Sequence, residues 1–448
     1  MPLRGRGKFK ERCSGVVRIE IGIAYFQKCI WIDNCHWLYD GREKEKIALM
    51  DRGRVCILSF SPVFRDARVL RQIEYASREY DVDVIGHGQW TPKWPRVRFQ
   101  EVRKAVSERK LKNLQSFILL FGGRIVPSLW MKAYWWQSDC RDALKILLRN
   151  EYSIIHANDL KALPAAVVAA SQCGGKVLFD AHEYYPGQAK YSSRKMQFLY
   201  SGYVDYLLRK CGPRADAFVT VSRGLADVYK KEFNLQGEVI MNAPPRAEVP
   251  FRPVEPGRIR LIYHGRATPQ RQPEKLIEMI DLLPERFTLH LMVIGDREGY
   301  VQKLVELAGR RSSGRVVIQE PVEPSMVVET LAKFDIGVYS LPPLVLNSRL
   351  ALQNKLFDFC AAGLAVVIGP SPEMTRVVKK YGFGIVADGF EGEDLARALK
   401  DLSVEQINRM KLEAIKASQL LNADLEMAKL MKIYRKVLKG NEGKLAGH

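Results

Sequence analysis

The sequence lacks any apolar run that approaches the roughly 18 to 20 residues needed to span a membrane. It also lacks, at its N-terminus, the apolar segment and cleavage site of a signal peptide. Its eight cysteines are scattered, without the Cys-Xaa-Xaa-Cys spacing of a zinc or redox site. We therefore expect buried free thiols in a cytoplasmic protein, with peripheral attachment to the inner face of the membrane as the alternative.

Long polybasic runs and recognisable nucleic-acid modules are missing too, so no nucleic-acid partner is expected. The chain is nevertheless basic, because 70 Lys and Arg against 50 Asp and Glu give a formal net charge of +20. Such an excess favours an acidic partner, for example nucleotide phosphates, an anionic glycan or an anionic membrane surface. No Asp-Xaa-Asp motif closes a predicted strand. We expect no metal site and no resident cofactor.

The length of 448 residues exceeds one ordinary core, and the hydrophobic content of 47% is typical of a folded protein. Residues 1–49 fit poorly with the rest of the chain. We interpret them as a loosely attached, poorly ordered extension, or as residues ahead of a true start at Met50. From residue 54 onward, strands alternate with helices, which predicts a parallel sheet wrapped by helices. The predicted strands are 54–60, 82–86, 153–156, 176–180, 217–221 and 238–241. The predicted helices are 66–79, 139–149, 160–172, 194–211 and 223–232, the last with Ser222 as its N-cap.

Residues 243–257 contain five prolines and are interpreted as an interdomain linker. A second α/β series occupies 258–403, with helices over 404–440 and a polar tail at 441–448. The predicted fold class is therefore α/β: two Rossmann-like α/β/α domains, the first over 50–242, face each other across a cleft, with closing C-terminal helices. The predicted strands of the second series are 259–264, 287–294, 315–318, 335–339, 364–368 and 384–386. Its predicted helices are 273–282, 297–310, 324–333, 351–361, 373–381 and 392–401.

The most informative segment begins with a polar loop that carries Asn347, Asn354 and Lys355 and opens a short helix. Unpaired backbone N–H groups and the helix dipole favour an anion at such a helix start, and Lys355 adds a full charge. Asp358 lies one turn after Asn354, so both side chains can face the same side. The alternative interpretation of this pair is helix capping and surface polarity.

This segment, with its helix end Ala361-Ala362-Gly363 and the strand after it, resembles the donor-sugar motif of retaining glycosyltransferases of the family-4 type (glycosyl transferases group 1). The resemblance extends from residue 53 to about 435 and implies the GT-B architecture. It also implies that Asp358, five residues before Gly363, binds the ribose of a nucleotide-sugar. Where the family carries its first glutamate, this sequence has Leu350, so either Asn347 takes over the sugar contact or sugar binding differs.

A second group of donor residues comes directly after a predicted strand. Gly265 allows close backbone approach, and Arg266 and Arg271 provide paired N–H donors that suit a diphosphate. The resemblance implies a diphosphate site here, with Arg271 or Gln272 in the second position, while a solvated arginine pair is the alternative. Glu373 begins the next predicted helix after the segment 354–363. It is a further donor-site candidate, or only a carboxylate favoured at a helix N-terminus. The turn that begins at Glu320 resembles the family's base-recognition turn.

The first half carries candidate catalytic and acceptor-side residues at predicted strand ends. His182 and Glu183 come after the strand 176–180; a histidine can change charge near neutral pH, and Glu183 can orient it or meet a sugar hydroxyl. An Asp-Ala-His-Glu segment recurs in the subgroup that the sequence resembles, although a histidine at a strand end can be structural. His156 and Asp159 close another strand. Asp159 is interpreted as an N-cap or an acceptor-side group, and His156 either faces the acceptor or supports the residues that do. Asp66 meets an acceptor hydroxyl or caps a helix.

The stretch 111–136 combines many aromatic and aliphatic residues with flanking cations. Such a composition suits the boundary between water and lipid, and an acceptor attached to a lipid would place an enzyme there. A buried helix pair with lysines that reach the surface is the alternative.

From these features we expect a hexosyltransferase-type enzyme that moves a sugar from a nucleoside diphosphate sugar to a glycan or lipid-linked acceptor. Retention of configuration is implied by the resemblance, with no protein nucleophile, and the cations replace a metal at the leaving diphosphate. A nucleotide-sugar epimerase of the same fold is the first alternative. Because of Leu350, a degenerate member that binds nucleotide without transfer is the second.

Overall fold

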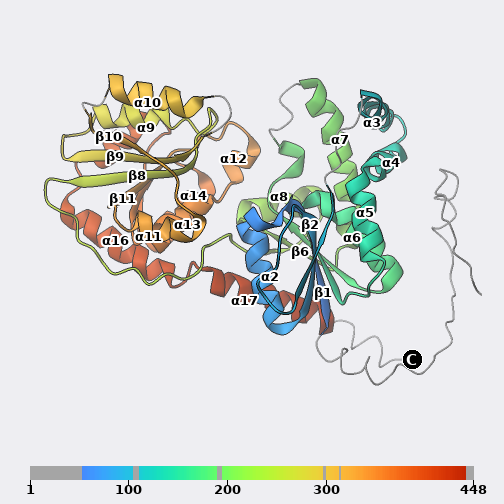
Figure 1. Ribbon diagram of the computed structural model, residues 1–448. Coiled ribbons are helices and arrows are strands. Elements are labelled where there is room, and N and C mark those ends of the chain that lie inside the picture. Colours follow the sequence, from blue (N-terminus) through green and yellow to red (C-terminus); the bar gives the residue numbers. More distant parts are fainter. Residues whose placement is uncertain (1–52, 104–109, 189–193, 296–298, 312–313, 440–448) are drawn as a thin grey trace, which may run out of the picture. The chain divides into compact units, whose positions relative to one another are not determined.

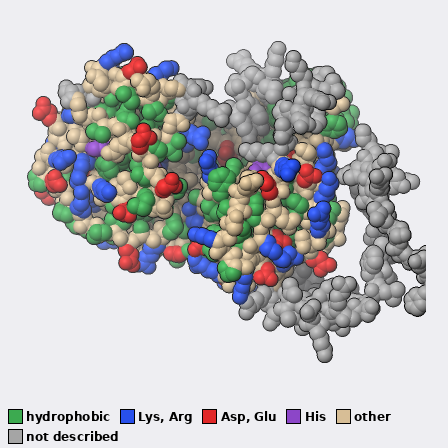
Figure 2. All heavy atoms as spheres, in the orientation of Figure 1, with side chains coloured by type: hydrophobic (Ala, Val, Ile, Leu, Met, Phe, Trp, Pro, Cys, Tyr) green, Lys and Arg blue, Asp and Glu red, His purple; other side chains and the backbone are tan. Residues whose placement is uncertain are grey.

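The computed structural model describes residues 53–103, 110–188, 194–295, 299–311 and 314–439. The expectations for residues 1–49 and 441–448 lie outside the described residues. Both sheets of the protein belong to one compact unit of the chain, Arg52–His448. On the face drawn in Figure 2, basic side chains occur over both domains.

Seven parallel strands of the described residues form the first sheet, in the order β3-β2-β1-β4-β5-β6-β7 (Figure 1). Their bounds are β1 (Arg54–Pro62), β2 (Asp81–His87), β3 (Val97–Glu101), β4 (Ile154–Asn158), β5 (Lys176–Ala181), β6 (Ala217–Thr220) and β7 (Glu238–Val239). The inner strands are near-continuous apolar runs because both faces of the sheet are covered by helices.

The helices of the first half lie on both faces of this sheet. They are α2 (Ala67–Glu79), α3 (Lys110–Gly122), α4 (Ser128–Trp136), α5 (Ser138–Leu147), α6 (Asp159–Cys173), α7 (Arg194–Cys211) and α8 (Arg223–Phe233). As predicted, Ser222 caps α8, its Oγ accepting from the Leu225 amide at 3.3 Å. The stretch 111–136 forms α3 and α4.

Six parallel strands of the described residues form the second sheet, in the order β10-β9-β8-β11-β12-β13. They are β8 (Ile259–Arg266), β9 (Phe287–Ile294), β10 (Val316–Gln319), β11 (Ile336–Tyr339), β12 (Ala365–Ile368) and β13 (Gly384–Val386). The helices are α9 (Glu274–Asp281), α10 (Tyr300–Arg310), α11 (Val327–Leu331), α12 (Leu346–Leu350), α13 (Asn354–Ala361), α14 (Pro372–Tyr381), α15 (Gly392–Leu399) and α16 (Val404–Ser418). Two Rossmann-like domains with C-terminal helices after them confirm the predicted fold class.

The last helix, α17 (Ala423–Lys439), packs on the first sheet and not on the second. Met427, Leu430 and Tyr434 are buried in one core with strands β1 and β2 and helix α2, and α17 lies beside α2 in Figure 1. The buried carboxylate of Glu426 accepts a hydrogen bond from the Met241 amide at 2.8 Å. The first domain is thus completed by residues from the C-terminal end of the chain.

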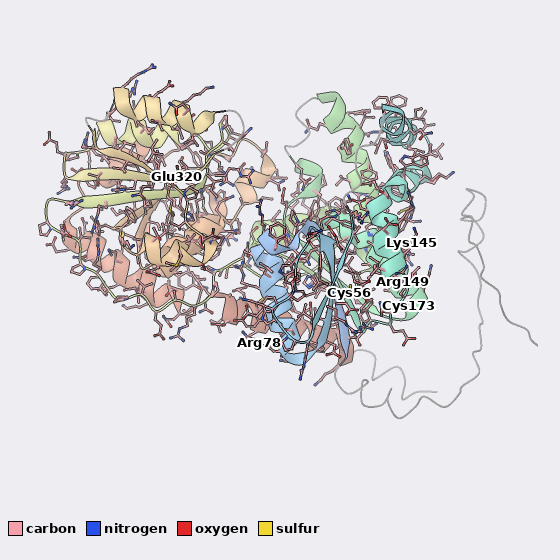
Figure 3. The ribbon with its side chains drawn as sticks, viewed as in Figure 1. Cys56, Arg78, Lys145, Arg149, Cys173 and Glu320 are labelled. Atoms are coloured by element: carbon pink, nitrogen blue, oxygen red, sulfur yellow. The ribbon has the colours of Figure 1, made fainter. Side chains whose placement is uncertain are left out.

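The described cysteines are all free, and four of the five are buried. Figure 3 shows Cys56 in β1 and Cys173 at the end of α6. Burial raises the pKa of the Cys56 thiol well above its usual range. The expectation of buried free thiols is confirmed for the four buried residues, while Cys13, Cys29 and Cys35 lie outside the described part of the chain. None of the helices that the structure describes is both long and apolar enough to cross a membrane.

Gly337 in β11 is the point at which α13 approaches the second sheet. A Cβ atom on Gly337 would lie 2.4 Å from the ring of Phe359, which α13 buries against the strand. Because a core at native density cannot absorb this atom, we expect Gly337→Ala to lower the free energy of unfolding by about 1–3 kcal/mol in denaturant titrations.

The matched control is Gly309→Ala in α10, where a Cβ would have open space around it. Since alanine favours helix over glycine, this variant should gain up to about 1 kcal/mol. Equal effects of the two substitutions would contradict the tight contact between α13 and β11.

Candidate active site

Among the residues predicted to bind the donor, Lys355 is buried and has no hydrogen-bond partner in the described part of the chain. Lys355 lies in the first turn of α13 and is 5% exposed. Its Nζ stands 4.1 Å from the centroid of the Tyr263 ring and 4.3 Å from that of Tyr339. Among the residues that the structure describes, no group accepts a hydrogen bond from this ammonium. Aromatic faces attract a cation but leave its N–H donors unsatisfied, so the site is suited to an anion.

Gly265, close to the end of β8, lies directly beside this lysine. Its φ of 110° is accessible essentially to glycine alone, and a Cβ here would lie 3.4 Å from Lys355 Nζ and 3.9 Å from an Arg271 terminal nitrogen. The two cations are therefore neighbours. Burial lowers the pKa of Lys355 well below its usual range, and the charge of Arg271 lowers it further. An anion bound between them would offset the repulsion from Arg271 and favour the charged form of Lys355.

Asp358 and His264 form the adjoining pair. His264 Nε2 lies 3.4 Å from the Asp358 carboxylate. Burial raises the pKa of Asp358 to about 7, against the opposing charges of Arg71 and Lys355. Burial, with Lys355 and Arg271, lowers the pKa of His264 to about 3. His264 is therefore neutral at physiological pH. The carboxyl group of Asp358 gains or loses its proton as the pH passes through about 7.

The other residues predicted for the donor side are more exposed than Lys355, except Glu373, which is also buried. Arg266 is exposed at the end of β8, and Asn354 is exposed at the start of α13, where its Oδ1 accepts from Asn242 Nδ2 at 3.0 Å. Glu373 is 4% exposed in the first turn of α14 and pairs with Arg376 at 3.2 Å. Glu320 comes directly after β10, at the carboxyl end of the strand (Figure 3).

Helix α12 connects the donor side to the first domain. Asn347 accepts from the Tyr184 amide at 2.8 Å, and its Nδ2 donates to the Tyr184 carbonyl at 3.1 Å and to the Glu183 carboxylate at 3.5 Å. Glu183 is exposed and also accepts from Gln188 at 3.2 Å. The structure thus brings the predicted residues Glu183 and Asn347 together, with the Asn347 amide occupied by backbone groups.

His182 lies between two carboxylates. Its Nδ1 is 3.3 Å from Asp159, and its Nε2 is 3.4 Å from Asp180, while the side chain remains 19% exposed. Burial alone would lower the pKa of His182, but Asp159 and Asp180 outweigh it and raise that pKa to about 9. At neutral pH the ring is an imidazolium, which donates hydrogen bonds and cannot act as a base.

Family models match both halves of the chain. The model of Glycosyltransferase Family 4 matches residues 60–243, and the model of Glycosyl transferases group 1 matches residues 258–404. The chain is a GT-B glycosyltransferase of the family-4 type. None of the curated proteins gives a significant match.

Solved structures share the fold of this glycosyltransferase at low identity. HepE from Anabaena in complex with UDP-glucose is 12% identical, with a TM-score of 0.61 over 86% of this chain and 100% of the other. Sucrose-phosphate synthase from Thermosynechococcus elongatus is 12% identical, with a TM-score of 0.62 over 87% and 100%. An alpha,alpha-trehalose-phosphate synthase (UDP-forming) from Burkholderia vietnamiensis is 10% identical, with a TM-score of 0.59 over 86% and 100%.

The acceptor-side expectations need correction in this glycosyltransferase. His156 is fully buried, with Nδ1 2.7 Å from the Tyr434 hydroxyl and Nε2 3.6 Å from Asp180, so it does not reach an acceptor. Asp66 caps α2, accepting from the Arg68 and Val69 amides at 3.2 Å each. Its alternative interpretation as a cap is thus what the structure shows.

Asp159 does not cap α6, contrary to the expectation. The N-cap is Asn158, and Asp159 has a φ of 68°, a left-handed conformation that is uncommon for a residue with a side chain. Its carboxylate instead accepts from the Tyr185 hydroxyl at 2.7 Å and pairs with His182.

Sequence reasoning missed three charged residues, Asp180, Arg68 and Arg71. Arg68 donates to both oxygens of Asp180, at 2.8 and 2.9 Å, and Gln72 adds a third bond at 2.7 Å. Arg71 donates to Asn242, whose amide bonds Asn354. The spacing of Arg68 and Arg71 on one predicted helix face was the available signal. Within the described ranges, no three His, Cys, Asp or Glu side chains gather as a metal site.

We expect His182 to give the folded state a pH-dependent stability. Its pKa is about 9 when folded, against an ordinary value of 6.5 in an unfolded chain, so its pairing contributes fully below pH 6.5 and is lost as pH rises through about 9. Denaturant unfolding over this window should show a falling free energy of unfolding, and His182→Gln should flatten the fall.

The control is His290→Gln in β9, where burial lowers the pKa of the ring instead. This variant should leave the decline with rising pH in place. A decline of the same slope in the wild type and in His182→Gln would show that Asp159 and Asp180 do not hold the proton on His182.

Proposed function

We propose that this glycosyltransferase transfers a hexose-type sugar from a nucleoside diphosphate sugar to a glycan or lipid-linked acceptor, with retention of configuration and without a metal ion. The observation that carries the donor assignment is the buried, unpartnered ammonium of Lys355 beside Gly265 and Arg271. A diphosphate supplies the oxygen acceptors that this ammonium lacks, and three cations, Arg266 included, can stabilise the charge that develops on it as the sugar leaves.

The roles of the other donor residues are inferred from their surroundings. Asp358 can accept hydrogen bonds from ribose hydroxyls when it is ionised; burial raises its pKa to about 7, and the charges of Arg71 and Lys355 oppose that rise. Asn347, Asn354 and Glu373 each lie in the first turn of a helix, α12, α13 and α14 respectively. The solved relatives bound to UDP-glucose make UDP-hexoses the first donors to test.

On the first domain, His182 supports a mechanism without a protein base. As an imidazolium it can donate a hydrogen bond to the sugar or to an acceptor, but it cannot take a proton from the acceptor hydroxyl. Glu183 is exposed, and its carboxylate, which accepts from Asn347 and Gln188, has acceptor positions enough to meet a sugar hydroxyl as well. Deprotonation of the acceptor then falls to the oxygens of the leaving phosphate.

We place the enzyme in the cytoplasm or at the inner face of a membrane.

The replacement of the family's glutamate by Leu350 also has a structural account. Leu350 packs on the core of the first domain, and its carbonyl accepts from Ser222 Oγ at 2.8 Å. A Cβ on Gly224 would lie 2.8 Å from the Leu350 side chain and 2.8 Å from the Glu373 carboxylate. Leucine therefore contributes packing here, and we propose that Glu373 provides the carboxylate on the donor side.

Product analysis with UDP-, GDP- and ADP-sugars, each with and without EDTA, tests the proposed reaction. Hydrolysis or transfer that survives EDTA supports it, and an α-linked product from an α-linked donor supports retention. Conversion of the donor to its epimer would establish an epimerase instead. Nucleotide binding without turnover of any sugar would establish a non-catalytic member.

Lys355→Met should separate donor binding from folding. Methionine keeps the volume and removes a buried unpaired charge, so stability should stay equal or rise. UDP affinity, measured by calorimetry, should fall by about 10- to 100-fold, the equivalent of about 1.5–3 kcal/mol for a charged hydrogen bond.

Lys411 provides a matched control, because it is also buried but pairs with Asp335 at 3.4 Å and the Phe334 carbonyl at 3.2 Å. Lys411→Met should destabilise the protein and leave UDP affinity unchanged. Tight UDP binding by Lys355→Met would disprove the placement of the diphosphate.

A further inference from the structure

The first domain exposes a group of large apolar side chains where α3, the turn after it and α7 meet (Figure 1). Six of the described apolar residues form this group, with exposed fractions from 48% to 78%. We call it the α3–α7 surface; its members are Phe117, Ile118, Phe121, Ile125, Val126 and Phe198. Soluble proteins seldom expose apolar residues in such a group unless it contacts a partner.

Contacts show that these residues form one surface. The rings of Phe117 and Phe121 stack with centroids 6.4 Å apart on one face of α3. The Arg124 guanidinium lies 3.8 Å from the Phe198 ring centroid and donates to Ser201 on the same helix at 3.3 Å. Arg124 therefore connects the turn that follows α3 with helix α7. Its charge lies beside the apolar side chains of the surface.

Helix α3 is held on the domain through its opposite face, where Leu120 packs against α4. Leu120 and Trp130 are buried in a small cluster between α3 and α4, and Trp130 Nε1 donates to the Leu120 carbonyl at 2.9 Å. A Cβ on Gly123 would lie 2.2 Å from the Trp130 ring, which shows how closely the turn approaches α4. Helix α3 thus has an anchored inner face and an apolar outer face.

The charge around this surface has one sign. Residues 109–138 contain five Lys and Arg and no Asp or Glu. Arg124 and Lys132 are described members of this set, and Lys132 is exposed on α4. On α7, Asp205 is already paired with Arg209 at 2.9 Å. Aromatic and aliphatic side chains bordered by unopposed cations match the boundary of a bilayer with negative headgroups.

A second copy of the chain matches this surface less well than a bilayer does. A two-fold contact places the same patch against itself, so Arg124 and Lys132 would meet their own copies without a carboxylate between them. Anionic lipid phosphates provide the missing counter-charge, and the acyl boundary provides the apolar phase.

We propose that the α3–α7 surface docks the protein on an anionic lipid bilayer, with its apolar side chains in the headgroup–acyl boundary and Arg124 and Lys132 at lipid phosphates. This docking uses no residue of the donor site and does not depend on the proposed reaction. It also orients the first domain, and not the second, toward the membrane.

Vesicle flotation of the full-length protein tests the proposal, with vesicles of phosphatidylcholine alone and of phosphatidylcholine mixed with phosphatidylglycerol. The protein should bind the mixed vesicles and not the neutral ones, and added salt should weaken binding. The triple variant Phe117→Ser, Ile118→Ser, Phe121→Ser should reduce the partition coefficient by about tenfold or more.

A matched triple variant, Leu282→Ser, Val305→Ser, Leu412→Ser, replaces apolar side chains of similar exposure on the second domain and should bind like the wild type. For charge, Lys132→Glu should weaken binding, while Arg149→Glu just after α5 (Figure 3) should not. Retained UDP binding and an unchanged melting temperature identify variants that are correctly folded.

Three results would overturn the proposal. The wild type could fail to bind mixed vesicles, which excludes the bilayer as partner. The α3–α7 triple variant could bind as well as the wild type, which assigns binding to another segment. Light scattering could show a wild-type dimer that the triple variant dissociates, which makes a second copy the occupant of the surface.

Discussion

One buried carboxylate, Asp180 at the end of β5, holds the first half of the active site together. Its oxygens accept hydrogen bonds from Arg68 and Gln72 of α2, and they lie close to His156 and His182. Burial by itself raises the pKa of Asp180, but Arg68 and His182 hold it well below its usual range, so the charge is kept. Because an unpaired buried charge is so unfavourable, this single group fixes the positions of its partners on separate elements.

The donor side shows the opposite arrangement. Around Lys355 the buried polar groups are left without protein partners, including the Tyr339 hydroxyl among the described residues. The buried charge of Asp180 in the first domain has its full set of partners, whereas the buried ammonium of Lys355 in the second domain has none among the described residues. An unsatisfied buried group of this kind is suited to binding a ligand. On the proposed function, the donor would restore at Lys355 the stability that the unpaired ammonium forgoes, while the pairing at Asp180 keeps the residues of the first domain in place.

Most strands and helices, and the motifs that contain Gly265 and Lys355, could be predicted from the sequence, because these patterns depend on residues that are neighbours in the chain. Predicted element bounds agree with the structure to within a few residues for most of the described chain. The strand β3 was missed because a short edge strand alternates polar and apolar residues and has little apolar content. The roles of Asp180, His156 and Asp159 could not be predicted, since each depends on contacts between elements far apart in the chain, and on a left-handed φ at Asp159 that no motif signals.

The position of α17 has a consequence for how the chain is made. Strands β1 to β7 leave the ribosome long before α17, yet one face of their sheet is covered in part by Met427, Leu430 and Tyr434 of that helix. The first domain is therefore discontinuous in sequence. Its nascent sheet keeps part of this face without its final cover, beside α2, until the second domain and α17 have been translated.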